Sequence, residues 1–233
     1  MGTIFFVATP IGNREDITYR AVRVLKEVDV ILCEDTRVTK KLLDFYTISK
    51  PLISYHHHST ARAIKEIKNL LEQGKNMALV TDAGTPGISD PGNELIHALL
   101  PFISRVQSVQ DTGESIHSVP IPGPSSAVAA LSVAGFPTDK FLFLGFPPHK
   151  NKRKQFFETV AQCEYTTVFF ESSHRVSKCL TELAEVLTTE RQVVICRELT
   201  KMFETIYRGT ARELQEAMRE ERGEFVLVVA GKN

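Results

Sequence analysis

Short apolar runs rich in β-branched residues recur along the chain, each bounded by turn residues. They occupy residues 4–8, 28–33, 77–80, 118–121, 141–144, 167–170, 193–197 and 225–230. Runs of this length and composition indicate buried strands. Segments of helical apolar spacing separate several of them, so the first half of the chain predicts parallel βαβ units. In the second half the runs lie closer together, which favours a mixed sheet.

Helical segments are expected at residues 18–28, 61–73, 94–100, 125–134, 152–162, 173–187 and 210–221. Thr210 and Glu213 fit a capping box at the start of the last segment. The sequence therefore predicts an α/β protein of two lobes, residues 1–122 with a mostly parallel sheet and residues 123–233 with a mixed sheet. Residues 102–117 interrupt this pattern, and we expect a surface loop or a short extra hairpin there.

A segment rich in glycine and proline, residues 81–92, directly follows the apolar run at 77–80. Two similar segments, residues 8–13 and 120–126, also follow apolar runs. Glycine and proline keep the backbone out of helix, which leaves N–H and C=O groups exposed at the carboxyl ends of the strands. Small ligands bind at that edge of open α/β sheets. The three segments therefore predict one ligand site.

Composition limits the class of protein and its partners. The 233 residues carry no formal net charge, so a bound polyanion would need a local basic patch. Four widely spaced cysteines without a CxxC motif indicate reduced core thiols, since neither a disulfide framework nor a zinc knuckle is suggested. No signal peptide is evident, and no apolar run approaches the roughly 18 residues that span a bilayer. We expect a cytoplasmic protein without a membrane partner.

Common catalytic signatures are absent from the sequence. It contains no G-x-G-x-x-G, no P-loop motif, no H-E-x-x-H and no G-x-S-x-G. The triplet His56-His57-His58 resembles a metal site, but a metal would need a third ligand from elsewhere, because only His56 and His58 share a face of an extended segment. Substrate contact or proton handling by His56 or His58, and a plain exposed loop, are the alternatives.

Charged residues follow several of the expected strands. Glu34, Asp35 and Arg37 come directly after residues 28–33, where unpaired charges would be costly to desolvate. They form either an arginine–carboxylate pair that orders the loop, or an acid/base and phosphate-binding cluster that faces the substrate.

Basic residues gather at the start of the helix expected at 152–162. Cations there oppose the helix dipole, so contact with phosphates would explain the run from His149 to Lys154, although a solvated face is the alternative. In the second half, Glu171, His174 and Arg175 follow one strand, and Glu198 and Lys201 follow another. These residues either line a cleft or form salt bridges between the lobes.

Taken in order, these segments resemble the ribosomal RNA small subunit methyltransferase I family, which belongs to the tetrapyrrole-methylase fold group of S-adenosylmethionine (SAM) enzymes. The resemblance spans nearly the whole chain and is carried by residues 7–13, 34–37, 54–56 with His58, 82–92, 121–125, Glu171 with His174 and Arg175, 197–198 with 200–201, and 223–225. His57 stands where the family usually has an acidic residue, residues 102–117 form a longer connection, and Phe170, Ser172 and Ser173 replace Tyr and Ala-Pro around Glu171.

The resemblance implies SAM in the cleft between the two lobes, no metal, a homodimer, and 2′-O-methylation of a cytidine ribose in 16S ribosomal RNA of the small subunit. The SAM-binding candidates are Pro10, Asp82, Gly84, Thr85, Pro86, Ile88, Ser125, Ser126, Phe170 and Leu199. Glu34, Asp35, His56 and His58 are candidates for the base, and Arg37 for a contact with a neighbouring phosphate. The predicted RNA contacts are Asn13, Lys150, Lys152, Arg153, Lys154, His174, Arg175 and Lys201.

Two other functions remain open at this point. A tetrapyrrole or diphthine-type methylase would use the same fold, although the basic run at residues 150–154 favours RNA. A ribosome-associated module without catalytic activity would bind RNA through that run, and its loops would only brace the lobes.

Overall fold

The computed structural model describes residues 1–56, 61–90, 92–103 and 115–232. The chain divides into two compact units, Met1–Ser125 and Ser126–Asn233. Most of the expected loop or hairpin at residues 102–117 lies outside the described residues, although Ile103 and Ile116 form an isolated parallel bridge.

The N-terminal unit contains a five-stranded parallel sheet, where the sequence predicts a mostly parallel one. Its strands are β1 (Thr3–Val7), β2 (Val30–Cys33), β3 (Leu52–Ser54), β4 (Met77–Leu79) and β5 (His117–Ile121). Their order across the sheet is β3-β2-β4-β1-β5, and each neighbouring pair is parallel. All five carboxyl ends therefore lie at one edge.

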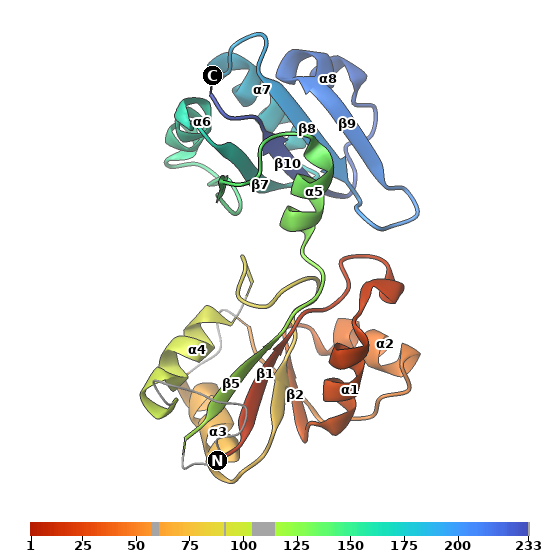
Figure 1. Cartoon of the computed structure of the whole chain (residues 1–233), viewed down its shortest axis with the longest axis vertical. Helices are drawn as coiled ribbons and strands as arrows, with labels where there is room; N and C mark the ends of the chain where they lie inside the picture. Colours follow the sequence, from red (N-terminus) through yellow and green to blue (C-terminus); the bar gives the residue numbers. More distant parts are fainter. Residues whose placement is uncertain (57–60, 91, 104–114, 233) are drawn as a thin grey trace. The chain divides into compact units, whose positions relative to one another are not determined.

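Helices cover both faces of this sheet (Figure 1). The short helical turn η1 (Arg14–Asp16), α1 (Tyr19–Glu27) and α2 (Thr36–Phe45) follow β1 and β2, whereas α3 (Ala61–Glu72), α4 (Asn93–Leu99) and η2 (Leu100–Phe102) follow β3 and β4. Side chains of α1 and α2 pack with Ala78 in one buried cluster, and side chains of α3 and α4 pack with Met77 and Leu79 in another. This alternation along β4 is the pattern of a strand buried on both faces.

The C-terminal unit contains a mixed sheet of β6 (Phe141–Phe143), β7 (Thr166–Ser172), β8 (Gln192–Arg197), β9 (Thr205–Thr210) and β10 (Glu224–Val229). The order is β6-β7-β10-β8-β9, with β6 and β7 parallel and the other neighbours antiparallel. The mixed sheet was also predicted from the sequence.

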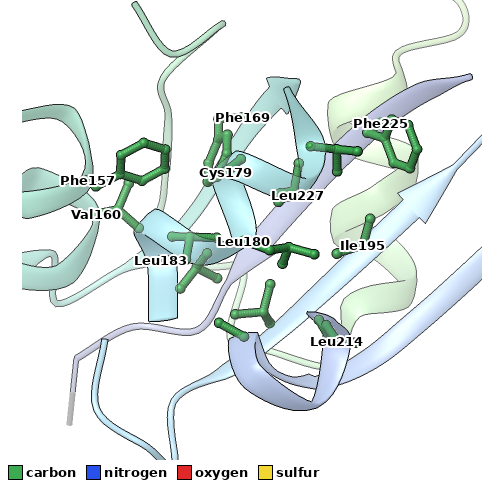
Figure 2. Close-up of a cluster of buried hydrophobic side chains, with 14 of the residues drawn as sticks. Phe157, Val160, Phe169, Cys179, Leu180, Leu183, Ile195, Leu214, Phe225 and Leu227 are labelled. Atoms are coloured by element: carbon green, nitrogen blue, oxygen red, sulfur yellow. The ribbon is translucent and has the colours of Figure 1, made fainter. Parts of the chain in front are cut away.

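One face of this second sheet packs against α5 (Ser126–Ala134). The other face packs against α6 (Arg153–Gln162), α7 (Val176–Val186) and α8 (Ala211–Ala217). Figure 2 shows the resulting core, in which Phe157, Leu180 and Leu183 from the helices meet Phe169 and Leu227 from the sheet. The capping box expected at Thr210 and Glu213 is present at the start of α8.

One α-helix and two strands of the described residues were not predicted. The helix α2 begins within the charged segment at residues 34–37, with Asp35 as its N-cap, because the Asp35 carboxylate accepts a hydrogen bond from Arg37 N. The strand β3 lies at one edge of the N-terminal sheet, and β9 lies at one edge of the C-terminal sheet. Neither strand contains a buried residue, and the apolar residues of each are few and lie among polar ones.

Candidate active site

The loops after β1 and β4 are hydrogen-bonded to each other at the carboxyl edge of the N-terminal sheet. Thr9 N donates to Gly84 O at 2.9 Å, and Gly84 N donates to Thr9 O at 3.1 Å. The buried Thr9 hydroxyl also donates to Thr81 O at 3.0 Å. These bonds fix the start of the glycine- and proline-rich segment over the end of β1.

The same loops lie where the chain changes from one face of the sheet to the other. β4 stands between β2 and β1, and the chain leaves it for α4. The chain leaves β1 and β2 for α1 and α2, which cover the opposite face (Figure 1). Open α/β sheets bind ligands in the crevice that this change opens beyond the carboxyl ends of the strands.

The third predicted segment, after β5, joins the first two. The Thr85 hydroxyl donates to Pro124 O at 3.0 Å, and Ala8 N donates to Ile121 O at 3.2 Å. A Cβ atom on Gly123 would lie 2.9 Å from Ala8 Cβ, so the two backbones approach too closely for a side chain. All three glycine- and proline-rich segments therefore lie together at one edge of the N-terminal unit.

The segment at residues 84–89 presents backbone rather than charge. Gly84 and Gly87 have φ angles of +83° and +84°, which glycine adopts without strain. Asn93 at the start of α4 donates its amide N–H to Gly87 O at 2.9 Å and holds this loop. Ile88 is exposed, whereas Pro86 is buried.

Carboxyl groups border this segment. Asp35 N donates to Asp82 Oδ1 at 3.2 Å, which connects the loop after β2 to the loop after β4. Partial desolvation raises the pKa of Asp82. For Asp90, burial followed by the negative charges of Glu34 and Asp82 raises the pKa to about 7. No role for Asp90 was predicted from the sequence, although its position near the end of the segment at residues 81–92 was an available signal.

Asp35 and Arg37 form the arginine–carboxylate pair considered from the sequence. Arg37 Nη2 lies 2.6 Å from Asp35 Oδ2, and the Arg37 side chain and backbone hydrogen bonds hold the pKa of Asp35 well below its usual range. The Arg37 side chain is 86% exposed, so the pair contributes little to folding and leaves the guanidinium accessible.

The histidine segment follows β3. His56 is exposed, and the preceding residue, Tyr55, is buried and donates its N–H to Cys33 O at 2.8 Å. His57 and His58 lie outside the described residues. Within the part of the chain that the structure describes, no group of three or more His, Cys, Asp or Glu side chains could hold a metal ion.

Asn13 is the N-cap of η1, where its side chain accepts a hydrogen bond from Glu15 N at 3.1 Å.

The basic run at the start of α6 divides into exposed and buried members. Lys150, Lys152 and Lys154 are exposed. Arg153 is 4% exposed and forms ion pairs with Glu171 and Glu182. Its guanidinium is therefore held by two carboxylates inside the unit, unlike the three exposed lysines.

Two further predicted RNA contacts are held by carboxylates. Arg175 lies 2.9 Å from Glu171 Oε1 with its side chain 18% exposed, whereas the neighbouring His174 is exposed. Lys201 pairs with Glu198 at 2.9 Å and with Glu224 at 2.8 Å. Both residues therefore form salt bridges within the C-terminal unit, and these are not the salt bridges between the lobes that were considered from the sequence.

The remaining SAM-binding candidates lie at several positions along the two units. Pro10 follows β1, Ser125 is the last residue of the first unit, and Ser126 begins α5. Phe170 and Leu199 are partly buried against the cluster that α5 covers. The Phe170 ring lies 5.3 Å from the ring of Phe146, and Phe170 N donates to Gly145 O at 2.8 Å.

Comparison with known proteins identifies the relatives of this chain. The family Tetrapyrrole (Corrin/Porphyrin) Methylases matches residues 3–215. Two relatives carry the name "Ribosomal RNA small subunit methyltransferase I". The protein from Halalkalibacterium halodurans is 45% identical over 233 residues, which cover 99% of this chain and 76% of the relative. The protein from Synechocystis sp. is 45% identical over 235 residues, which cover 99% of this chain and 80% of the relative.

A solved structure shares the fold. The uroporphyrin-III-C-methyltransferase from Thermus thermophilus superposes with a TM-score of 0.66 at 20% identity, covering 99% of this chain and 94% of that one. Among the described residues, no helix has both the length and the apolar character needed to cross a bilayer.

Proposed function

The chain belongs to the ribosomal RNA small subunit methyltransferase I family of the tetrapyrrole methylases, and we propose that it transfers a methyl group from SAM to the ribose 2′-hydroxyl of a cytidine in 16S ribosomal RNA. The observation that carries this proposal is the 45% identity to relatives of that name over 99% of the chain. The position of the three loops at the sheet edge supports it independently.

The residues at this edge fit SAM, which supplies an electrophilic methyl group on a sulfonium cation. Such a cation is stabilised by carbonyl oxygens and oriented dipoles, and Lys or Arg beside it would repel it. The segments at residues 84–89 and 121–126 contain no charged side chain. We propose that Pro10, Asp82, Gly84, Thr85, Pro86, Ile88 and Ser125 hold SAM, together with Ser126, Phe170 and Leu199 of the second unit.

The protein's part in the reaction is alignment and proton transfer. Holding the two reactants in line can lower the barrier by up to about 7–11 kcal/mol in ideal cases. A base that accepts the hydroxyl proton contributes about 10²- to 10⁴-fold. Glu34, Asp35, His56 and His58 are the proposed bases. The exposed Arg37 guanidinium is proposed to bind a neighbouring phosphate, for which its planar geometry is suited.

RNA would be held mainly by cations. Lys150, Lys152 and Lys154 are proposed to contact phosphates, because they are exposed on one short stretch of a chain with zero net charge. Asn13, His174, Arg175 and Lys201 are proposed as further contacts. We also propose that the protein acts as a homodimer in the cytoplasm, where ribosomal subunits are available.

The test uses purified protein, SAM carrying a labelled methyl group, and small ribosomal subunits. We expect label in one position of 16S RNA, at a linkage that resists alkaline hydrolysis because its 2′-hydroxyl is blocked. Label on a base, or no label in RNA, would refute the proposal. A tetrapyrrole substrate in a parallel reaction tests the methylase alternative, and calorimetry with SAM tests the non-catalytic one.

The proposed bases are tested one by one. Single alanine variants of Glu34, Asp35, His56 and His58 are compared in single-turnover methylation at saturating SAM. At least one variant should lose about 100-fold or more in rate while SAM affinity is retained. Unchanged rates in all four would show that none of these residues is the base.

A further inference from the structure

A buried carboxylate in the C-terminal unit binds two arginines at once. Glu171 is the sixth residue of β7, and its side chain is fully buried. Its Oε2 lies 3.1 Å from Arg153 Nη2, and its Oε1 lies 2.9 Å from Arg175 Nη2. Arg153 also pairs with Glu182 of α7 at 2.8 Å. Two cations from separate segments therefore meet on one carboxylate.

The same two arginines hold one loop by its backbone. Arg153 Nη1 donates to Pro148 O at 3.2 Å, and Arg175 Nη1 donates to Pro147 O at 3.1 Å. Proline has no N–H, so the carbonyl oxygens are the only backbone groups through which these two residues can be hydrogen-bonded. The loop connects β6 to α6 and carries Lys150 and Lys152.

Stability alone does not account for this arrangement. Replacing a buried ion cluster by apolar side chains is often neutral or stabilising, because desolvation offsets the attraction between the charges. The neighbouring core is apolar throughout, with Phe157, Cys179 and Leu183 among its members. The charges instead fix the geometry of the loop, since each guanidinium binds a carboxylate and one particular backbone carbonyl at the same time.

The backbone beside Arg153 is strained. Lys152 has a φ of +64°, a left-handed conformation that costs a non-glycine residue about 1–2 kcal/mol. It precedes α6 without a side-chain capping bond. Strain of this kind persists where the surroundings impose it, often at functional positions. Here the next residue, Arg153, is anchored by Glu171 and Glu182.

We propose that Glu171 is a positioning residue for RNA binding, which acts through Arg153 and Arg175 to fix the Pro147–Pro148 backbone and thereby to present Lys150 and Lys152 to phosphates. The inference rests on the proposed function, because it takes RNA as the partner. The half-exposed Phe146 ring lies on the same loop and offers a surface for a base. The chemistry favours single-stranded RNA over a duplex, since stacking needs an unpaired base.

The test is the salt dependence of binding to small ribosomal subunits. Lys150→Ala/Lys152→Ala should lower the slope of log Kd against log salt by about one to two, because two phosphate contacts are lost. Glu171→Gln should lower this slope by a similar amount, although both lysines remain. It should also raise Kd about tenfold at moderate salt, which corresponds to the loss of about one charged hydrogen bond. Combining the two changes should add little to either.

Glu213→Gln is the matched control. This substitution also replaces a hydrogen-bonded carboxylate of the C-terminal unit. Glu213 belongs to the capping box of α8 and forms no bond to the loop between β6 and α6. It should leave the slope unchanged. SAM affinity should be unaffected in all variants, which separates a displaced loop from general unfolding. If Glu171→Gln does not fold, Arg153→Lys serves instead, because it keeps a positive charge near Glu171 but lacks the second nitrogen that reaches Pro148 O.

The outcomes separate this inference from the proposed function. A wild-type slope in Glu171→Gln or its substitute, with a lowered slope in the lysine variant, would overturn the positioning role. A wild-type slope in the lysine variant would show that this loop does not bind RNA, even if methylation proceeds. Because binding is measured directly, a failure of methyl transfer would overturn the proposed function alone.

Discussion

Replacing Gly84 by alanine tests whether the crevice at the sheet edge receives the methyl donor. The φ of Gly84 is +83°, and a new Cβ would lie 3.5 Å from Ile11 Cγ2 and 3.8 Å from Pro124 O. Both distances are ordinary van der Waals contacts, so no neighbour has to move. The effect on folding is then the strain of a left-handed alanine, about 1–2 kcal/mol. The added methyl group would occupy the space between the loops after β1 and β5.

Gly135 provides a control with the same backbone geometry. Its φ is +78°, nothing lies within 4 Å of a Cβ built there, and it follows α5 in the other unit. Gly135→Ala should therefore lower stability by a similar amount. For a chain of this size, each kcal/mol corresponds to roughly 2–4 °C in Tm. Thermal unfolding of both variants measures the strain without reference to any ligand.

The two variants should differ in SAM binding, measured by calorimetry well below Tm. Gly84→Ala should raise the Kd for SAM at least tenfold, about 1.4 kcal/mol, because the methyl group takes space between the loops that are proposed to hold SAM. Gly135→Ala should bind as the wild type does. If Gly84→Ala matched Gly135→Ala in both Tm and Kd, the assignment of this crevice to SAM would be refuted.

Two further predictions concern stability. The pKa of Asp90, raised to about 7 from 3.8, means that the native state holds a proton that the unfolded chain releases, so this group makes stability fall as pH rises from about 4 to 7. Asp90→Asn should remove that fall and be more stable than wild type at pH 8 in urea unfolding; an unchanged pH dependence would contradict the argument. Arg191 is buried and donates to Ala161 O, Cys163 O and Ala230 O. Arg191→Met should cost about 3 kcal/mol or more, because these carbonyls lose their partner, and a loss below about 1 kcal/mol in the same assay would show that water replaces it.

The parts of the fold that could be predicted are those with a local signal. The apolar runs located the inner strands and also the edge strands β5 and β6. A strand buried on both faces, such as β4, has no polar positions to obscure its apolar run. The loops at residues 8–13, 81–92 and 120–126 could be grouped because parallel strands place their carboxyl ends at one edge. The hydrogen bonds between these loops could not be predicted, because they join residues far apart in the sequence, such as Thr85 and Pro124.

The parts that could not be predicted depend on which way a side chain points and on what surrounds it. In α2, Thr39 and Leu43 are the buried residues among charged neighbours, so the helix resembled a charged loop. In the basic run, composition could not show that Arg153 points inward. Its spacing from Phe157 and Val160, both buried on the same face of α6, was the available signal.

The strand order of the N-terminal sheet has a consequence for how this unit folds. β1 and β2 are formed from residues before 34 but are never neighbours, because β4, starting at Met77, lies between them. A nascent chain that ends before Met77 therefore has β1 on one side and β2 paired with β3 on the other, with a gap where the centre of the sheet belongs. Closing the sheet requires contacts between distant parts of the chain, which slows folding and leaves strand edges exposed to misassociation in the meantime.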